Sequence, residues 1–332
     1  MAKKRALFAG FGSYGKKWYD MMKLRDDVEV VCAVKRTQGE VGRPGGELAH
    51  IPYRPSLAEA IAEFRPDFVF NLTPPDAHFA VGKTALEQGL PVLSEKPVTE
   101  SLEQAEEVLR LRRAKRLPYV VAQKFRYMAW ARTMRRVIED GRIGTPGQAN
   151  VTFHDSPKFW PGAYYLEVAQ PFLSDYCPHS FDLIRYILGE NPSEIFARSF
   201  NPSWSWFKGK AAASVCLTFR SGLVVNYYGT WVSTGRSTTQ NGNWRVEGDR
   251  GALILDADRL FLETGRDARE EIPIPRWDKP DEMIILDDFL RVLGMGGRAE
   301  TDIEDNIFSM QMVTASVASA ISQQSAALRT SF

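Results

Sequence analysis

The sequence predicts two domains: an α/β domain with a doubly wound parallel sheet, followed by an α+β domain with a large, mostly antiparallel open sheet. Strand and helix patterns alternate with short connections up to about residue 120, and a glycine-rich turn follows the first strand. From Gln148 onward, strands with a period of two dominate, and hairpin turns such as Ser221-Gly222 join them. A length of 332 residues also favours two domains, which we place at 1–122 and 123–332.

The first domain is expected to alternate five strands with four helices. Ser56 with Glu59, and Ser101 with Gln104, are typical of capping boxes at helix starts. Gly89 is the expected stop of another helix. The expected strands are 5–9, 28–34, 67–72, 91–94 and 119–122, the helices are 16–24, 57–64, 78–88 and 101–115, and an arm rich in Gly and Pro covers 39–55.

The second domain is expected to contain six main strands and few helices. The strands are 149–153, 194–199, 212–220, 223–230, 243–248 and 252–256. The helices are 127–140, which crosses into this domain, and 178–188, 280–293 and 301–325.

Composition excludes several classes of function. Hydrophobic residues make up 44% of the chain and charged residues 25%, which are ordinary values for a globular protein. A net charge of +1 offers no field for a nucleic acid or a membrane surface, and no apolar run approaches the roughly 18 residues of a membrane span. Cys32, Cys177 and Cys216 lack metal-type spacing, so we expect no metal site and reduced thiols in a cytoplasmic protein.

The glycine turn is the most specific motif of the chain. It reads Gly10-Phe11-Gly12-Ser13-Tyr14-Gly15, directly after a short apolar strand and directly before a helix. The first glycine permits a tight turn, the second lets the backbone approach a pyrophosphate, and the third lets the helix pack on the strand. The helix N-terminus then offers N–H groups to the phosphates. The turn therefore predicts a Rossmann-type dinucleotide site; a turn without a ligand is the alternative.

The end of the second strand predicts which dinucleotide binds. An acidic residue that reads the ribose 2′-hydroxyl is expected there, but the strand ends in Lys35-Arg36-Thr37. A guanidinium can hold a 2′-phosphate through two parallel hydrogen bonds. We therefore expect NADP rather than NAD, the alternative being that Lys35 and Arg36 only solvate a loop.

Two further loops follow parallel strands at the edge where ligands bind. They are Thr73-Pro74-Pro75-Asp76-Ala77-His78 and Glu95-Lys96-Pro97, and we expect Thr73, Pro74, Pro75, His78, Glu95 and Lys96 to contact the cofactor. Pro97 holds Lys96 extended at the strand end. An ammonium there could stabilise charge developing on a carbonyl or alkoxide oxygen. The alternative is a surface lysine paired with Glu95.

Asp175 and His179 supply a candidate acid–base pair. They are four residues apart, so on a helix they share one face, and a carboxylate could orient the imidazole and raise its basicity. The structural alternative makes Asp175 a helix cap, with Pro178 in the first turn and His179 in the core. Asp182 is expected to be bonded nearby rather than to act in catalysis.

Aromatic residues gather in two segments, 159–165 and 204–207. Aromatic faces suit the apolar side of a sugar or cyclitol ring, and they are also enriched at subunit interfaces. We assign Trp160 and Tyr164 to the substrate, and Trp204 and Trp206 to an interface.

Together these motifs resemble the glucose–fructose oxidoreductase and inositol dehydrogenase (Gfo/Idh/MocA) family. The resemblance rests on the glycine turn, the 73–78 loop, Glu95-Lys96-Pro97, Asp175-x-x-x-His179-x-x-Asp182, and 246–253. It implies a Rossmann domain and an α+β domain whose open sheet pairs subunits into a homodimer or homotetramer. It also implies that Lys96, His179 and Asp175 are the catalytic residues, and that all three contact the substrate. Cys177-Pro178 departs from the small residues that the family places before its histidine.

The resulting expectation is an NADP-preferring oxidoreductase that transfers hydride between a nicotinamide and a sugar, sugar derivative or cyclitol. Two alternatives stay open. Some members of the family keep the hydride on the cofactor and act as glycoside hydrolases. A sensor that binds the dinucleotide without turnover is the other, although it would not need proton-transfer groups such as Lys96 and His179.

Overall fold

The structure is a computed structural model and describes residues 3–36, 41–43 and 45–332. Part of the arm expected at 39–55, and Thr37 at the predicted 2′-phosphate site, lie outside the described residues. The chain divides into two compact units, each made of two segments. The first unit consists of the segment up to Lys124 and of Lys279–Met310. The second unit consists of Phe125–Asp278 and Gln311–Phe332. The boundary predicted at residues 122/123 stays a prediction.

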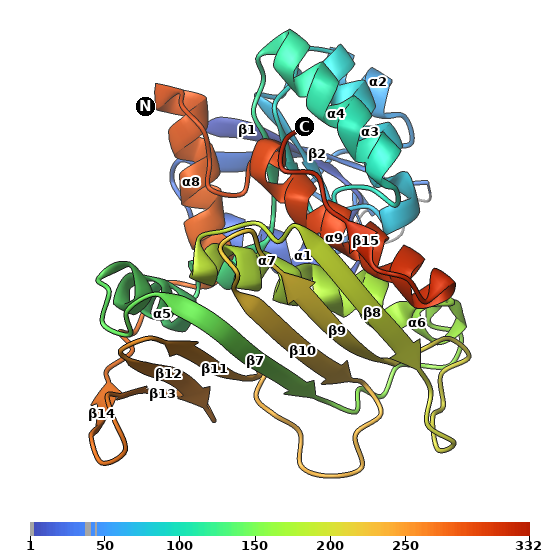
Figure 1. The fold of residues 1–332 in the computed structure, drawn as a ribbon. Helices are drawn as coiled ribbons and strands as arrows, with labels where there is room; N and C mark the ends of the chain where they lie inside the picture. Colours follow the sequence, from blue (N-terminus) through green and yellow to red (C-terminus); the bar gives the residue numbers. More distant parts are fainter. Residues whose placement is uncertain (1–2, 37–40, 44) are drawn as a thin grey trace. The chain divides into compact units, whose positions relative to one another are not determined.

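In the described part of the first unit, six parallel strands form one sheet in the order β3-β2-β1-β4-β5-β6 (Figure 1). This is the strand order of a doubly wound dinucleotide-binding sheet. The strands are β1 Lys4–Ala9, β2 Val28–Val34, β3 Tyr53–Arg54, β4 Phe68–Asn71, β5 Val92–Ser94 and β6 Tyr119–Val121. The predicted parallel α/β domain is confirmed, and the short edge strand β3 is an addition.

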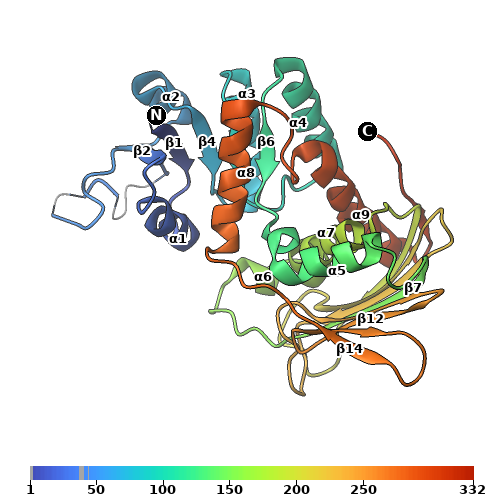
Figure 2. The same cartoon turned by 90° about the vertical axis from the view of Figure 1, so that its left-hand side faces the viewer.

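Helices cover both faces of this sheet. They are α1 Ser13–Met22, α2 Leu57–Phe64, α3 Pro75–Glu87, α4 Leu102–Lys115 and α8 Asp281–Met295. Phe68 and Phe70 on β4 point to the same face because side chains alternate along a strand. Phe70 packs edge-on against Trp18 of α1, and Phe68 packs against Phe289 of α8. Helix α8, visible in front of the sheet in Figure 2, is therefore part of this layer although it lies far along the chain.

The predicted helix caps in this unit are confirmed. The Ser56 side chain accepts from the Glu59 N–H, and the Ser101 side chain accepts from the Gln104 N–H. Each satisfies one of the N–H groups that a helix start leaves without a partner.

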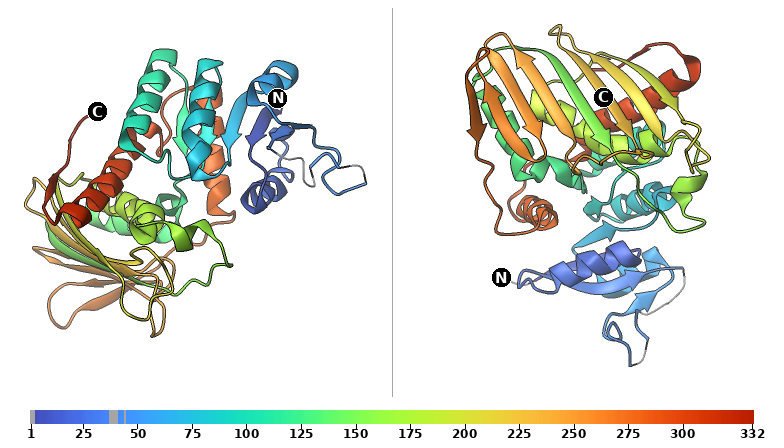
Figure 3. Two further views of the ribbon diagram at one scale, coloured as in Figure 1. Left: turned by 90° about the vertical axis from the view of Figure 1, so that its right-hand side faces the viewer. Right: turned by 90° about the horizontal axis from the view of Figure 1, so that it is seen from below.

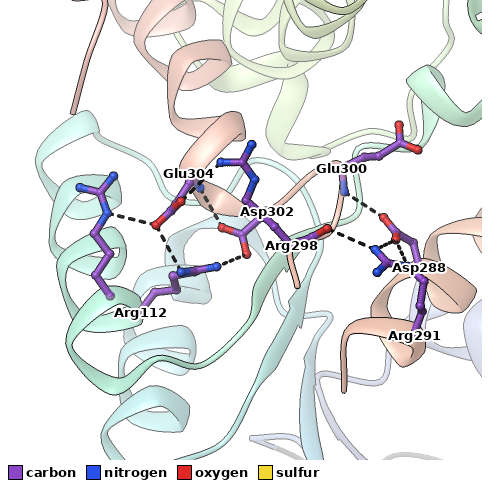
Figure 4. Close-up of polar contacts among 8 residues, drawn as sticks. Arg112, Asp288, Arg291, Arg298, Glu300, Asp302 and Glu304 are labelled. Atoms are coloured by element: carbon purple, nitrogen blue, oxygen red, sulfur yellow. Dashed lines mark hydrogen bonds and ion pairs between the residues drawn. The ribbon is translucent and has the colours of Figure 1, made fainter. Parts of the chain in front are cut away.

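Helix α9 spans Ile303–Ser322. Charged groups fix the link between α8 and α9 to the rest of the first unit (Figure 4). The Arg112 guanidinium on α4 lies 3.0 Å from the fully buried Asp302 carboxylate and 3.2 Å from Glu304. The Val121 N–H donates to the Thr301 carbonyl oxygen, which adds a strand-like contact beside β6. The beginning of α9 is therefore anchored to α4 and to the edge of the parallel sheet.

In the described part of the second unit, nine strands form one sheet in the order β14-β13-β12-β11-β7-β10-β9-β8-β15. Only the pair β7–β10 is parallel among these strands, so the predicted mostly antiparallel sheet is confirmed. The strands are β7 Pro146–His154, β8 Glu194–Phe200, β9 Ala212–Thr218, β10 Val224–Thr230, β11 Asn243–Gly248, β12 Gly251–Asp256, β13 Arg259–Glu263, β14 Arg269–Ile272 and β15 Ala326–Ala327.

One face of this sheet packs on helices and the other is open. The inner face carries α5 Ala129–Glu139, α7 Cys177–Leu188 and the second half of α9, with the short α6 Tyr164–Glu167 at one end (Figure 1). Figure 3 shows the outer face with no helix of the described residues over it. Phe196, Phe200 and Asn226 are exposed there. The predicted open sheet is therefore present.

Candidate active site

The glycine turn has the geometry that its three glycines predict. Gly10 has φ +91°, and a Cβ there would lie only 2.5 Å from the carbonyl oxygen of Leu72, which directly follows the neighbouring strand β4. No atom lies within 4 Å of a Cβ built on Gly12, whereas a Cβ on Gly15 would lie 3.2 Å from the Gly10 carbonyl oxygen. The turn is thus tight at Gly10, open at Gly12 and closely packed at Gly15, as expected for a backbone that approaches a pyrophosphate.

The start of α1 can receive an anion. Gly12 is the N-cap residue, so among the described residues no side chain caps the helix, and its first turn holds no acidic residue. The first N–H groups and the positive end of the helix dipole then face the side where phosphates bind in such folds. The open space at Gly12 fits a pyrophosphate, so the residues present suit a dinucleotide.

At the end of β2, Lys35 is half-buried and Arg36 is exposed. The Lys35 N–H donates to the Arg54 carbonyl oxygen on β3, which fixes the backbone there. Neither side chain forms an ion pair with another residue of the described ranges. Lys35 and Arg36 therefore occupy the strand end at which a residue that binds the cofactor ribose is expected.

His78 joins the two other loops at this edge of the sheet. Its ring is buried, with Nδ1 2.5 Å from the Pro97 carbonyl oxygen and Nε2 2.7 Å from the Thr73 carbonyl oxygen. Burial lowers the pKa of His78, and the two carbonyl contacts oppose that shift. Asn71 adds a further bond, since its side chain donates to the His78 carbonyl and accepts from Thr73 Oγ1. The ring thus holds both loops. Its contact with the cofactor stays a prediction, as do the contacts of Pro74, the N-cap residue of α3, and of Pro75, its first residue.

The half-buried Lys96 follows the last strand residue of β5 by two positions. Its backbone N–H lies 3.3 Å from Glu95 Oε2, and Glu95 Oε1 accepts from the indole N–H of Trp18 at 2.9 Å. Burial raises the pKa of the Glu95 carboxyl, and the Trp18 N–H and the Lys96 charge act in the opposite direction. Lys96 therefore stands at the carboxyl edge of the sheet on a loop that a partly buried carboxylate organises.

In the second unit, His179 lies in the first turn of α7 and contacts two aromatic rings. The Phe125 ring is stacked on the imidazole, with centroids 4.4 Å apart and planes 16° apart, and the Tyr176 ring meets it edge-on. The imidazole is half-buried. These two ring contacts restrict the orientation of the imidazole, and a fixed orientation favours proton transfer.

Asp175 does not occupy the N-cap position of α7, and its role stays a prediction. It lies in a π-helical turn, Phe172–Tyr176, that runs directly into α7, and Tyr176 occupies the N-cap position without a side-chain cap bond. Pro178 does stand in the first turn, as predicted. A π-helical turn has no signal in the sequence here, because packing around it decides the bonding pattern.

Asp182, three residues after His179 on α7, forms a buried ion pair with Arg126. Arg126 Nε lies 2.8 Å from Asp182 Oδ2, and the Asp182 side chain is fully buried. The expectation that Asp182 is bonded nearby is therefore confirmed. Arg126 was missed because its partner lies 56 positions away in the chain.

The predicted substrate aromatics are exposed. Trp160 and Tyr164 are 68% and 57% exposed, and Trp204 and Trp206 are exposed as well. The Trp204 indole donates to the Val232 carbonyl oxygen, which fixes its loop to the strand end after β10. Their assignment to a substrate or to an interface stays a prediction.

Lys96 belongs to the first unit, and Asp175 and His179 belong to the second. Their convergence on one oxygen stays a prediction. No group of His, Cys, Asp or Glu suited to a metal ion occurs among the described residues, and no helix there combines the length and hydropathy of a membrane span.

Comparisons with known proteins bear on the family to which the chain belongs. Residues 4–123 match the family described as "Oxidoreductase family, NAD-binding Rossmann fold", and 131–254 match the "GFO/IDH/MocA C-terminal domain". D-apiose dehydrogenase of Paraburkholderia graminis is 25% identical over 94% of this chain and 86% of its own length. The 1,5-anhydro-D-fructose reductase of Ensifer adhaerens is 25% identical over 83% of this chain and 84% of its own.

Among solved structures, an oxidoreductase from Agrobacterium radiobacter in complex with NAD+, L-tartaric acid and magnesium superposes with a TM-score of 0.87. It is 21% identical and covers 98% of each chain, so this likeness shows the fold. Because models of both parts of one family match most of the sequence in the right order, the chain belongs to the Gfo/Idh/MocA family of NAD-binding oxidoreductases.

Proposed function

We propose that this protein is an NADP-preferring dehydrogenase or reductase that acts on a CH–OH group of a sugar, sugar derivative or cyclitol. The observation that carries the proposal is the carboxyl edge of the parallel sheet, where one compact unit holds both an open glycine cradle and the half-buried Lys96. A lysine at the same edge of the sheet as a dinucleotide site favours redox chemistry on a carbinol over binding alone.

The cofactor would lie with its pyrophosphate at Gly12 and the N-terminus of α1, and its 2′-phosphate at Lys35 and Arg36. When bound, it supplies a nicotinamide ring that accepts or returns a hydride. The 73–78 and 95–97 loops, which His78 joins, would form the wall beside the nicotinamide. Since the Agrobacterium structure contains NAD+, the preference for NADP rests on the two cations alone.

Three side chains would handle the substrate's hydroxyl proton and charge. His179 would take or return the proton, since imidazole titrates near neutral pH. The Lys96 ammonium would hydrogen-bond the same oxygen and stabilise its charge in the transition state. Asp175 would orient the imidazole or a substrate hydroxyl.

The substrate class follows from the exposed aromatics and from the relatives. Trp160 and Tyr164 would pack on the apolar face of a ring. The relatives named above act, by their names, on D-apiose and 1,5-anhydro-D-fructose, and a further relative is the inositol 2-dehydrogenase of Rhizobium meliloti. Sugars and cyclitols are therefore the first compounds to screen.

The catalytic roles are tested with Lys96→Ala and His179→Ala after a screen of sugars and cyclitols with NADP. We expect turnover to fall by roughly 10²- to 10⁴-fold in each variant. Lys115→Ala, which changes an exposed lysine in the last turn of α4, is the matched control and should retain turnover. Near-normal turnover in both test variants would contradict the mechanism. Product that forms without net conversion of NADP would favour the glycoside hydrolase alternative.

The cofactor preference is tested by comparing kcat/KM for NADP and for NAD. Arg36→Ala should lower the NADP/NAD ratio by roughly tenfold, because a charge-assisted bond to phosphate is lost. Arg110→Ala, which removes an exposed arginine from α4, should leave the ratio unchanged. A wild-type ratio of one or below would contradict the role given to Lys35 and Arg36.

We further propose a cytoplasmic homodimer or homotetramer that forms through the open sheet face. Free thiols at Cys32, Cys177 and Cys216 suit a reducing compartment. The exposed rings of Phe196 and Phe200 on the outer face support a subunit contact there.

A further inference from the structure

Trp18 connects the helix that follows the glycine turn to the loop that carries Lys96. Its indole N–H donates to Glu95 Oε1 at 2.9 Å. The indole is almost fully buried, and it packs edge-on against Phe70 with ring centroids 4.7 Å apart. The nitrogen therefore has little freedom to move away from the carboxylate.

The Glu95 carboxylate also contacts the backbone of the lysine. Its second oxygen, Oε2, lies 3.3 Å from the backbone N–H of Lys96. One carboxylate thus accepts from a rigid indole on α1 with one oxygen and from the Lys96 backbone with the other. Rotation of the carboxylate would break both contacts together.

Two charged groups act directly on Glu95, and two more are linked to them by ion pairs. Lys96 lies on its own loop, and Lys124 follows β6; both charges lower the pKa of the Glu95 carboxyl, which burial raises overall. Lys124 is itself 3.1 Å from Glu282 on α8, and Glu282 lies 2.7 Å from Lys17 on α1. The Trp18 N–H is the neutral donor in this set, and it favours the ionised carboxylate because it bonds to the charged form.

We propose that Trp18 is a positioning residue: its indole N–H fixes the Glu95 carboxylate, which fixes the backbone of Lys96 and keeps the lysine amine directed at the reacting oxygen. The proposal rests on the function proposed above for Lys96. Because α1 also offers the pyrophosphate cradle at its N-terminus, one rigid helix sets the position of both the cofactor and the lysine.

The structural arm of the test needs no substrate. Trp18→Phe keeps an aromatic ring against Phe70 and removes the N–H. In the protein without cofactor, we expect the Lys96 amide to exchange its hydrogen roughly tenfold faster in this variant, since its acceptor is no longer held. The control is Trp244→Phe, which removes an equivalent buried indole bond to the Asn241 carbonyl oxygen in the second unit and should leave Lys96 exchange unchanged.

The kinetic arm separates positioning from binding. Trp18→Phe should lower kcat by roughly tenfold and leave the Kd for NADP within about twofold, because the glycine turn is untouched. The acid limb of the kcat–pH profile of this variant should move to higher pH. The Glu95 carboxylate loses a hydrogen-bond donor, and this loss raises the pKa of the carboxyl. In a Glu95→Gln background, Trp18→Phe should have little further effect, because the two residues act in series.

Two results would overturn the proposal: Lys96 exchange that is unchanged by Trp18→Phe, or a Trp18→Phe effect on kcat that is equally large in the Glu95→Gln background. The second result would mean that the indole acts through packing alone. If Trp18→Phe does not fold, Glu95→Gln carries the exchange measurement by itself and should show the same acceleration. Normal turnover of Lys96→Ala would contradict the proposed function, whereas faster Lys96 exchange in Trp18→Phe would still support the indole–carboxylate contact.

Discussion

His78 illustrates how one buried ring can determine a pH response. Both ring nitrogens face carbonyl oxygens, which only accept hydrogen bonds. A neutral imidazole can donate to one of them, and an imidazolium can donate to both. Burial disfavours the imidazolium and places the pKa of His78 below its ordinary 6.5. The neutral ring with one donated bond is therefore the form that we expect in the folded protein at neutral pH.

This protonation state predicts how stability depends on pH. Below pH 6.5 the unfolded chain takes up a proton at His78 before the folded protein does, so the ring's contribution to stability is lost as pH falls. His78→Gln retains a donor without titrating, and we expect it to be less stable than the wild type by about 1–3 kcal/mol at pH 8. The difference in the free energy of unfolding between the two proteins should be smaller at pH 5. Urea unfolding followed by circular dichroism measures it. A difference that widens at pH 5 would mean that the imidazolium holds both loops.

The sequence could predict residue roles where the determining contacts are local. Gly10 is one such case, because its place in the turn demands a positive φ whatever lies around it. Trp18 is the opposite case, since Glu95 lies 77 positions away and a tryptophan three residues after the glycine turn suggests only a core position. The Arg126–Asp182 pair was likewise hidden by sequence separation, although Asp182 itself was expected to be bonded.

At the scale of elements, the glycine turn and α1 contribute both to stability and to the proposed cofactor binding. Mutations at different glycines can separate these two contributions. Gly10→Ala would place a methyl group 2.5 Å from the Leu72 carbonyl oxygen at a positive φ, so we expect it to destabilise the first unit. Gly12→Ala meets no atom within 4 Å. It should leave the melting temperature within about 2 °C and weaken NADP binding by roughly tenfold, because its methyl group occupies the space of the pyrophosphate. Calorimetric melting and titration of NADP measure the two effects, and unchanged NADP affinity in Gly12→Ala would argue against the cradle.

The ion pair between Arg126 and α7 predicts a large effect on stability. Asp182 is fully buried, and Arg185 Nη1 also lies 3.8 Å from its carboxylate. Asp182→Asn leaves the buried Arg126 guanidinium without its counter-charge, so we expect a loss of about 3–5 kcal/mol in the free energy of unfolding. The double variant Arg126→Met with Asp182→Leu should lose less, since neither charge remains. Urea unfolding of both variants checks this, and equal losses would show that the pair does not act as a unit.

Element boundaries show where the sequence was informative. Strand β2 was predicted at its observed bounds because a run of β-branched residues between charged residues marks it. Helix α3 starts at Pro75, before the predicted start at His78, although proline at the first helical position was a usable signal. Strand β13 was also within reach, since the apolar run from Leu260 to Leu262 precedes the Gly265 turn. The two-residue β15 carries no such pattern.

At the scale of the whole molecule, the open face of the nine-stranded sheet is the surface that we propose for subunit association. Phe196 on β8 lies in register with Cys216 on β9 and, across it, Asn226 on β10, so the face mixes apolar and polar groups. Such a composition resembles a subunit interface, which is only moderately apolar over its full area.

Disruption of this face should change the oligomeric state. Phe196→Glu combined with Phe200→Glu places two like charges on the outer face, and we expect the mass in solution to fall to that of a monomer or a smaller oligomer. Ile321→Glu, which adds a charge at an exposed apolar position on α9, is the control and should leave the mass unchanged. Light scattering after size exclusion gives the mass. A wild-type protein that is already monomeric would refute the proposed assembly.

The order in which the chain visits its two compact units has a practical consequence. A recombinant fragment cut after residue 122 would retain all six parallel strands but not Phe289, so the Phe68 side of β4 would be left facing water. Such a truncation is expected to aggregate, whereas a version that fuses residues 279–310 back through a short linker should stay in solution. Any attempt to study the first unit in isolation should therefore start from a gene that joins its two coding segments, and not from a simple truncation.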